Sequence, residues 1–301
     1  MIKCFGIFSF FLAAFFANAQ SHSAPDSCSL LWCISGNGLT DTSYLFGTMH
    51  SSDVRLRKFD VSWKSAFESC KVIVGETEMQ NSSMDMTSLF QSMLAYTTIE
   101  MVLPPEKVTA IKNFISSRLG PDMAPIMMKM QPFFLMVLLM ELPEDLRLVE
   151  EIMDIHIQAL ATRSGKEVVG LETLTEQLQV INGVPVLYQA ELLYEFVSMS
   201  SAGLPIDLGG LDDSLLIQTY LNQCLDEFVV LSEQIDFDER LMTQLLPMRN
   251  VKFVNRLEKL IVEKSVFCAV GALHLPDNNG MIAMLRARGY TVSPVNFKFL
   301  Q

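Results

Sequence analysis

Basic residues and histidine are scarce in this chain. It has 22 lysines and arginines against 34 aspartates and glutamates, which gives a formal net charge of -12 at pH 7. Because that charge repels phosphate groups, the composition excludes nucleic acid as a partner and argues against anionic lipid surfaces. The chain also contains no G-x-S-x-G sequence. It therefore lacks the nucleophile elbow that many serine hydrolases use.

No apolar run is long enough to stay in a membrane as a permanent helix. At the start of the chain, Lys3 precedes an apolar core from Phe5 to Phe16 and the small residues 17–19. That is the pattern of a secretory signal peptide. We expect a signal peptide over residues 1–19, cleaved after Ala19, and a secreted or periplasmic protein with no transmembrane anchor after cleavage. An uncleaved anchor is the alternative.

Closely spaced cysteine pairs of the kind that hold structural zinc are missing as well. Of the six cysteines, Cys4 would leave with the signal peptide, so an odd number remains and at least one is unpaired. Cys28 and Cys33 are close enough in the chain to bridge a short loop. Cys70 and Cys268 lie in or beside apolar runs, and we expect them to be buried thiols.

Half of the residues are apolar, enough for one large core over residues 20–301. Four apolar runs that lead into glycine are expected to be buried strands, at 44–46, 72–74, 168–171 and 266–270. A fifth apolar run, at 290–295, follows a helix-like segment that ends at Gly289. Alternation of strands and helices predicts an α/β fold with a mainly parallel or mixed central sheet.

Two long helical stretches interrupt these strands, at about 84–164 and about 175–263, and we interpret both as insertions into a single domain. Twelve of the nineteen methionines lie between Met79 and Met153. Helix core is the simpler interpretation of this cluster, and an adaptable groove for an apolar peptide or lipid is the alternative. Copper binding through thioethers would call for regular spacing, which these methionines lack.

Two of the four histidines follow the same short motif, a glycine, two residues and then histidine, behind predicted strands. They are His50 and His274. Glu76 and Glu172 also follow glycines, at the ends of two further predicted strands. Because the carboxyl ends of parallel strands meet at one edge of a sheet, we expect these four side chains to lie together.

Two imidazoles and one carboxylate are the usual protein ligands of a catalytic zinc ion, with a fourth position left for water. We predict that His50, His274 and one glutamate, here assigned as Glu76, bind a divalent metal ion and that the other, Glu172, moves a proton. The two glutamates could also have the reverse roles, with Glu76 as the catalytic group. The alternative is that the histidines only cap their strands by hydrogen bonding. Glu78 is a local alternative to Glu76, and Glu172 could instead help to cap the helix that follows it.

Arg249, with Asn250 beside it, opens a further helical stretch. The fixed fork of donors on its guanidinium group suits a substrate carboxylate or a developing oxyanion. A salt bridge to one of the many acidic residues is the alternative. Of the other histidines, His22 follows the signal peptide and His156 lies on an amphipathic helical stretch, so we expect neither in the site.

Several blocks of the sequence resemble the TraB/GumN family, whose wider superfamily includes the TIKI proteases and erythromycin-esterase-like proteins. The resemblance covers nearly the whole chain after the signal peptide. The blocks are SYLFGTMHSSD (43–53), CKVIVGETEM (70–79), GKEVVGLETLTEQL (165–178), the pair Arg249-Asn250, and VFCAVGALHLP through RARGYTV.

The resemblance implies an α/β core interrupted by helices, in a secreted or surface-exposed protein, and zinc, manganese or cobalt as the metal. By position, His50 and His274 match the paired histidines of the family, and Glu76 matches its strand-end glutamate. Glu172 and Arg249 match the acidic residue of the third block and the arginine of the arginine-asparagine pair. The chain departs from the family at residues 277–279, so we expect a differently shaped loop there.

Together these features predict a metal-dependent hydrolase, a peptidase that acts on an extracytoplasmic peptide or protein. The first alternative is a non-catalytic exported binding protein that sequesters a hydrophobic peptide or signal in the methionine-rich region. The second is an esterase-like reaction in which a histidine acts as base without a metal.

Overall fold

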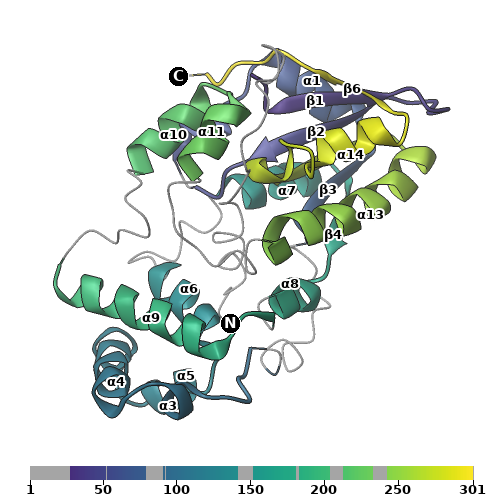
Figure 1. Ribbon diagram of the computed structural model, residues 1–301. Helices are drawn as coiled ribbons and strands as arrows, with labels where there is room; N and C mark the ends of the chain where they lie inside the picture. Colours follow the sequence, from purple (N-terminus) through teal and green to yellow (C-terminus); the bar gives the residue numbers. More distant parts are fainter. Residues whose placement is uncertain are drawn as a thin grey trace. The chain divides into compact units, whose positions relative to one another are not determined.

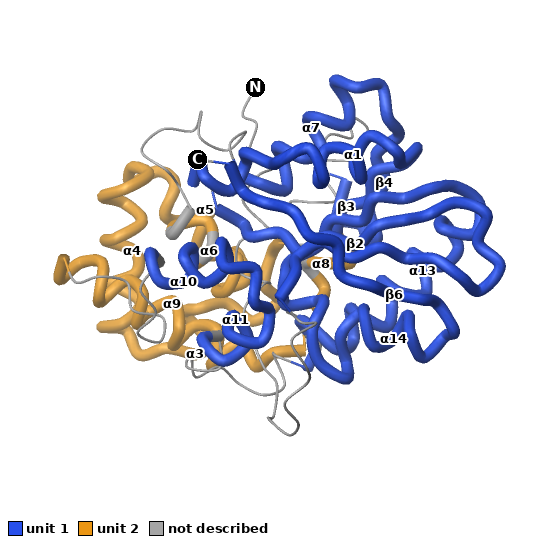
Figure 2. The backbone as a smooth tube through the Cα atoms, turned by 90° about the horizontal axis from the view of Figure 1, so that it is seen from above, with its two compact units in different colours: residues 1–81, 147–173, 211–301 blue, residues 82–146, 174–210 orange. Residues whose placement is uncertain are grey.

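The computed structural model describes residues 28–51, 53–78, 91, 93–141, 152–180, 183–203, 213–232 and 243–300. The predicted signal peptide and His22 lie outside these residues. The chain divides into two compact units (Figure 2). Unit 1 comprises residues 1–81, 147–173 and 211–301, and unit 2 comprises residues 82–146 and 174–210. In the described part of the chain, no helix has the length and apolar character needed to cross a membrane.

Unit 1 contains a six-stranded sheet in the order β4-β3-β5-β2-β1-β6 (Figure 1). Its strands are β1 (Leu31–Ser35), β2 (Ser43–Thr48), β3 (Val72–Thr77), β4 (Glu167–Glu172), β5 (Val266–Gly271) and β6 (Thr291–Pro294). β3 pairs in parallel with β4 and β5, and β2 pairs in parallel with β5. β1 is antiparallel to both β2 and β6. The predicted α/β fold with a mixed, mainly parallel sheet is confirmed.

The interior strands have the continuous apolar character of strands that are covered on both faces. All six residues of β5 and all six of β3 are buried. β1 was not predicted, although the sequence LLWCIS before Gly36 carries the same signal as the other strands: a short apolar run that ends at a glycine.

Helices cover both faces of the sheet (Figure 1). α1 (Val61–Ser69) and α7 (Met153–Arg163) lie on one face, and α13 (Arg249–Glu263) and α14 (Met281–Ala287) lie on the other. α13 buries Phe253, Val254, Leu257 and Ile261, a spacing that gives a helix one apolar side. Unit 1 also has α10 (Asp213–Leu221), α11 (Leu225–Ser232), the 3-10 turns η2 (Val54–Arg57) and η6 (Ala272–His274), and the π-helix η5 (Gln244–Met248).

Aromatic side chains fill the core between the sheet and α1. Trp63 of α1 packs edge-on against Phe46 of β2 and Phe267 of β5, with ring centroids 5.7 Å and 5.1 Å away. Phe59 stacks on Trp63 at 3.8 Å. Each large side chain buried in this way stabilises the fold by about 1.5–3 kcal/mol, so this cluster holds β2 and β5 firmly in place beneath the loops that follow them.

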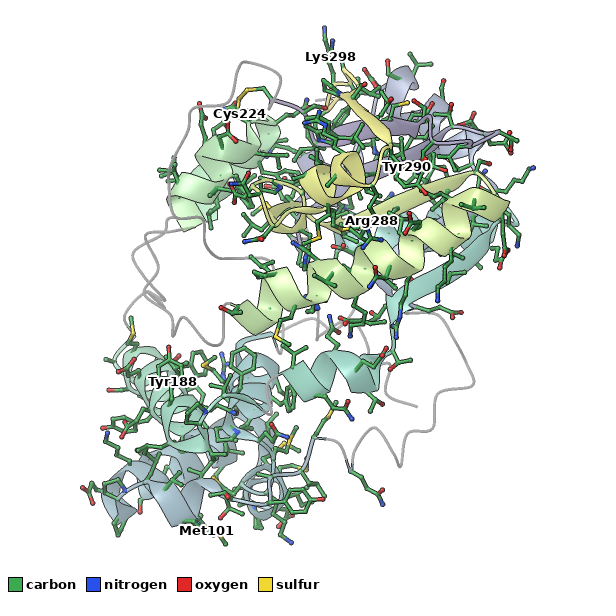
Figure 3. The ribbon with its side chains drawn as sticks, turned by 45° about the vertical axis from the view of Figure 1, so that its right-hand side comes forward. Met101, Tyr188, Cys224, Arg288, Tyr290 and Lys298 are labelled. Atoms are coloured by element: carbon green, nitrogen blue, oxygen red, sulfur yellow. A yellow bond between two sulfur atoms is a disulfide. The ribbon has the colours of Figure 1, made fainter. Side chains whose placement is uncertain are left out.

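The disulfide joins Cys28 to Cys224, residues 196 positions apart in the chain (Figure 3). The short bridge between Cys28 and Cys33, which their spacing would allow, does not form. Strand β1 extends the chain between these two cysteines, which carries Cys33 away from Cys28 into the sheet. Cys33, Cys70 and Cys268 are free, and burial raises the pKa of Cys70 to about 11.

Unit 2 is helical. Its helices are α3 (Ile99–Val102), α4 (Pro105–Leu119), α5 (Ala124–Met127), α6 (Pro132–Glu141), α8 (Leu174–Val180) and α9 (Val186–Ser201). α9 packs against α3, α4 and α6. Proline opens α4 and α6, where a missing backbone N–H is harmless, and Gly120 ends α4 with a φ of 92°. Of the remaining helices, α7, α10, α11 and α13 belong to unit 1.

Several of the methionines that the structure describes in unit 2 are core residues. Met127, Met128, Met130 and Met136 are all buried, while Met101 is exposed, on α3 (Figure 3). This packing supports the simpler of the two interpretations of the methionine cluster.

Candidate functional site

The carboxyl ends of the four parallel strands each carry one of the polar side chains singled out by the sequence. Glu172 ends β4, Glu76 lies near the end of β3, His274 follows β5 in η6, and His50 follows β2. Since the strand order is β4-β3-β5-β2, these side chains succeed one another along one edge of the sheet. All four are buried, with exposed fractions of 5% or less.

Glycines near the ends of these strands let the backbone pass close to the backbone of neighbouring segments. A Cβ atom on Gly47 would lie 3.0 Å from the Cα of Ala272, and one on Gly170 would lie 2.7 Å from the backbone nitrogen of Glu78. The distance at Gly170 is too short for a side chain, and the one at Gly47 would force the neighbouring backbone to shift. Gly47, in the first copy of the repeated motif, and Gly170 therefore allow close packing at this edge of the sheet.

Arg249 connects three of the predicted site residues. It begins α13 directly after η5 and is only 1% exposed. Its Nε and Nη2 atoms donate to Glu172 Oε1 at 2.9 Å and 2.6 Å, and Nη2 also donates to Glu76 Oε2 at 2.6 Å. Its Nη1 atom lies 3.2 Å from His274 Nε2 and 3.3 Å from the carbonyl oxygen of Leu245.

These contacts occupy every nitrogen of the Arg249 side chain. A guanidinium group so enclosed has no donor left over for a substrate, which favours the salt-bridge alternative over direct contact with a substrate carboxylate or oxyanion. Arg249 neutralises two buried carboxylates instead. Removing water from charged groups is costly unless they are paired in this way.

Glu76 is held in its charged form. Burial alone would raise the pKa of its carboxyl group, but the guanidinium of Arg249 and the neighbouring His274 outweigh burial and lower the pKa to about 2. Its Oε1 atom also accepts a hydrogen bond of 2.8 Å from the backbone nitrogen of Gly271. This bond ties the end of β3 to the turn that carries His274.

His274 has a defined tautomer. Its Nδ1 atom lies 2.5 Å from Asn250 Oδ1, and the amide nitrogen of Asn250 donates to the carbonyl oxygen of Asn279 at 2.7 Å. Because that second bond turns Oδ1 toward the ring, Nδ1 of His274 is the donor and Nε2 the acceptor. Nε2 lies 3.6 Å from Glu76 Oε1. Burial, reinforced by the charge of Arg249, lowers the pKa of His274 to about 3, so the ring is neutral.

The loop at residues 277–279 thus contributes to the site, because the carbonyl group of Asn279 holds Asn250 in place. The asparagine that follows Arg249 is therefore more than a neighbour of the arginine. Its side chain orients His274.

His50 is paired with Asp154, a residue that the sequence did not single out. His50 Nδ1 lies 2.6 Å from Asp154 Oδ2, an ion-pair contact whose angle is outside that of a hydrogen bond. Burial alone would lower the pKa of His50, but the Asp154 carboxylate outweighs it and raises the pKa above its usual value. Asp154 belongs to α7, more than a hundred residues from His50 in the chain, so no local pattern could have revealed it.

A small pocket lies between α7 and the ends of the strands. It is lined by His50, Glu76, Asp154 and Gln158 among others, and it has room for about one water molecule. His50 and Glu76 thus share one pocket.

Glu172 bonds to a second cation besides Arg249. Lys252, one turn further along α13, donates from Nζ to Glu172 Oε2 at 2.8 Å. The side chain of Lys252 is 28% exposed, so this end of the network reaches the surface. These two partners, Arg249 and Lys252, account for both oxygens of Glu172, which favours a place in the site over the role of a helix cap. His156 is half-buried on α7, where burial lowers its pKa.

The side chains fit a divalent metal in chemical type. Both histidines have Nδ1 beside an oxygen of Asp154 or Asn250, which is how metal-binding histidines are usually held, and Glu76 is ionised. Across the described residues, however, no three His, Cys, Asp or Glu side chains converge tightly enough to hold a metal ion. The positive charge that lies beside the Glu76 carboxylate in this structure is that of Arg249.

Comparison with known proteins adds to this geometry. A model of the TraB/PrgY/gumN family matches residues 30–294. The chain belongs to this family. The protein named metalloprotease TIKI1 of Danio rerio is 26% identical to it, over 92% of this chain and 67% of that protein. Metalloprotease TIKI1 of Xenopus tropicalis is 24% identical, over 95% of this chain and 68% of that protein. No solved structure matches the chain significantly.

Proposed function

We propose that this TraB/PrgY/gumN family protein is a metal-dependent hydrolase that cleaves peptide bonds in an extracytoplasmic peptide or protein. The observation that carries the proposal is the state of the two histidines. His50 Nε2 has no hydrogen-bond partner among the described residues, and His274 Nε2, which lies beside Arg249 Nη1, is 3.6 Å from the ionised Glu76. The relatives named metalloproteases support the same reaction class.

In this proposal, His50, His274 and Glu76 hold the metal, which is zinc, manganese or cobalt. The metal would supply an acidified water and polarise the scissile carbonyl group. Glu172 takes up the proton of the attacking water and returns it to the leaving amine. Arg249 bridges Glu76 and Glu172 and fixes their spacing. Lys252 is the exposed cation of the network and is available to a substrate.

The place of action follows from the predicted signal peptide. We propose that the protein works in the periplasm or outside the cell. The alternative of a non-catalytic binding protein rested on a methionine-lined groove, and the burial of Met127, Met128, Met130 and Met136 does not favour it.

The experiment is hydrolysis of a mixed peptide library by the metal-depleted protein, followed by mass spectrometry. We expect no cleavage after chelation, and recovery when zinc, manganese or cobalt is added back. Glu172→Gln should reduce the cleavage rate by roughly 100- to 10,000-fold, the usual contribution of a general base, without loss of metal. Lys264→Gln, which removes a surface ion pair with Glu167, is the matched control. Cleavage that persists at full rate after chelation would contradict the proposal.

A further inference from the structure

Helices α10 and α11 form a hairpin, residues 213–232, that contacts both histidine turns of the site. The phenol oxygen of Tyr220, on α10, donates to the carbonyl oxygen of Gly47 at 2.5 Å. Gly47 is the glycine of the motif that leads into His50. The other helix, α11, packs against η6, the turn that ends in His274. The α10–α11 hairpin therefore holds the ends of β2 and β5 together.

Tyr220 is the buried link between this hairpin and the end of β2. Its side chain is only 1% exposed, and its hydroxyl oxygen also lies 3.4 Å from the sulfur of Met153, the first residue of α7. Its ring lies 5.8 Å from the ring of Phe299, measured between centroids. Because these contacts fix the ring, the hydroxyl group holds the Gly47 carbonyl oxygen in a defined place. Loss of the hydroxyl would remove that donor from a buried acceptor.

A disulfide attaches the hairpin to the sheet. Cys224 lies between α10 and α11, and its partner Cys28 directly precedes Ser29 (Figure 3). Ser29 is buried, and its hydroxyl oxygen lies 2.9 Å from the carbonyl oxygens of Leu31, in β1, and Val295, which follows β6. Cys28 is thus joined to a part of the sheet that is fixed by hydrogen bonds. The disulfide extends that anchorage to the α10–α11 hairpin.

This disulfide is accessible to a reductant. Cys28 is exposed and Cys224 is partly exposed, whereas the free cysteines Cys70 and Cys268 are buried. Reduction begins when a thiolate attacks one of the two sulfurs, so access decides which disulfides react. A dithiol that reduces this bond supplies two electrons and two protons. The protein S–S bond breaks, two S–H bonds form, and the dithiol becomes a disulfide.

We propose that the disulfide between Cys28 and Cys224 is a redox switch for the site. When it is formed, the α10–α11 hairpin keeps the turns of His50 and His274 in place, and when a dithiol reduces it, both turns loosen. This inference rests on the proposed function for the activity that the switch controls. Disulfides form and persist in oxidising compartments outside the cytoplasm. The site is therefore completed only after export.

The test is hydrogen–deuterium exchange of the purified protein, measured by mass spectrometry in peptides that cover residues 44–50 and 270–275. Oxidised wild type is compared with wild type reduced by dithiothreitol and with the double variant Cys28→Ser/Cys224→Ser. The rate of peptide cleavage is measured on the same samples. Dithiothreitol treatment of the double variant is one control, since it shows any effect of the reagent elsewhere. Cys33→Ser, which removes a free cysteine, is the other.

Reduction or removal of the disulfide should speed exchange in both peptides by roughly 10- to 100-fold, because a lost cross-link makes local opening easier. Exchange in β3 and β4 should change much less, since these strands lie on the far side of β5 from β2. Cleavage should slow by roughly tenfold or more as the site loses its geometry. Both controls should behave like their untreated or wild-type counterparts.

Tyr220→Phe is a milder variant that keeps the disulfide. It removes one hydrogen bond from Gly47, so exchange should rise by roughly 2- to 10-fold over residues 44–50 and stay unchanged over residues 270–275.

Equal exchange before and after reduction, or a rise that is uniform over the whole sheet, would overturn the inference. Local loosening with an unchanged cleavage rate would overturn it as well. Local loosening in a protein whose oxidised wild type cleaves no peptide would uphold the control of the two turns by the disulfide and refute the proposed function.

Discussion

Unit 1 and unit 2 bury different kinds of side chain. At its sheet edge, unit 1 encloses Arg249, Glu76, Glu172 and two histidines, all at most 5% exposed. Unit 2 encloses methionine, leucine and phenylalanine and leaves its ion pairs near the surface, as in the contact of Lys107 with Glu191, whose side chains are 28% and 38% exposed. Among the residues that the structure describes, the buried charged side chains lie in unit 1.

This difference separates packing from function. A well-packed apolar core stabilises a fold at no electrostatic cost, whereas buried ions must be compensated and often add no net stability. A cluster of buried charges with strongly shifted pKa values is therefore a candidate for chemistry. In unit 1 the pKa of Glu76 falls to about 2 and that of His274 to about 3.

The largest effect is expected from Arg249→Met. This change leaves Glu76 and Glu172 buried without their shared cation, and we expect the free energy of unfolding to fall by about 3–5 kcal/mol. Lys107→Met, which removes the ion pair with Glu191 in unit 2, should change it far less, because solvent screens an exposed ion pair. Urea unfolding of both variants measures the contrast. Equal effects would show that burial of charge does not distinguish the two units.

A somewhat smaller loss is expected from a core change in unit 2. Met136 is fully buried, and Met136→Ala should lower the free energy of unfolding by about 2–5 kcal/mol through the cavity that it leaves. Since Met136 lies in unit 2, zinc affinity and the peptide cleavage rate of the folded protein should stay at the wild-type level. A tenfold loss of zinc affinity in this variant would break the proposed division between packing and chemistry.

A pH effect is expected from the buried His274. The pKa of His274 is about 3 in the folded protein and about 6.5 in a free side chain, so the unfolded chain binds the proton more tightly. Stability should therefore fall as the pH drops from about 6.5 toward 3, by up to about 1.4 kcal/mol per pH unit. In His274→Asn that part of the slope should disappear. Urea unfolding of the metal-free proteins at several pH values measures it, and identical slopes would contradict the assignment of a buried neutral His274.

Much of the sheet could be predicted because its strands are short apolar runs with a glycine near the carboxyl end. That signal found β2, β3, β4 and β5, together with the polar residues at their ends. It does not give the order of the strands, which depends on how the intervening helices pack. Nor does it give the register of Phe46 opposite Ala269, which depends on contacts between segments two hundred residues apart.

The residues that contact the histidines were harder to predict. Asp154 lies on a helix that the sequence suggested to be part of an insertion, and only the packing of α7 on the sheet brings it to His50. The partner of Cys28 was missed for the same reason, since Cys224 follows a helix far along the chain. Local sequence patterns identify polar residues at the ends of strands. They do not identify the residues that contact them from helices far away in the chain.

The most direct test of the account is the metal content of the purified protein. Wild type and the double variant His50→Asn/His274→Asn are each loaded with zinc, manganese or cobalt, freed of excess metal and measured by elemental analysis. The account predicts a stoichiometric ion in wild type and almost none in the double variant. Full occupancy in the double variant, or no retention of any of the three metals by wild type, would contradict it.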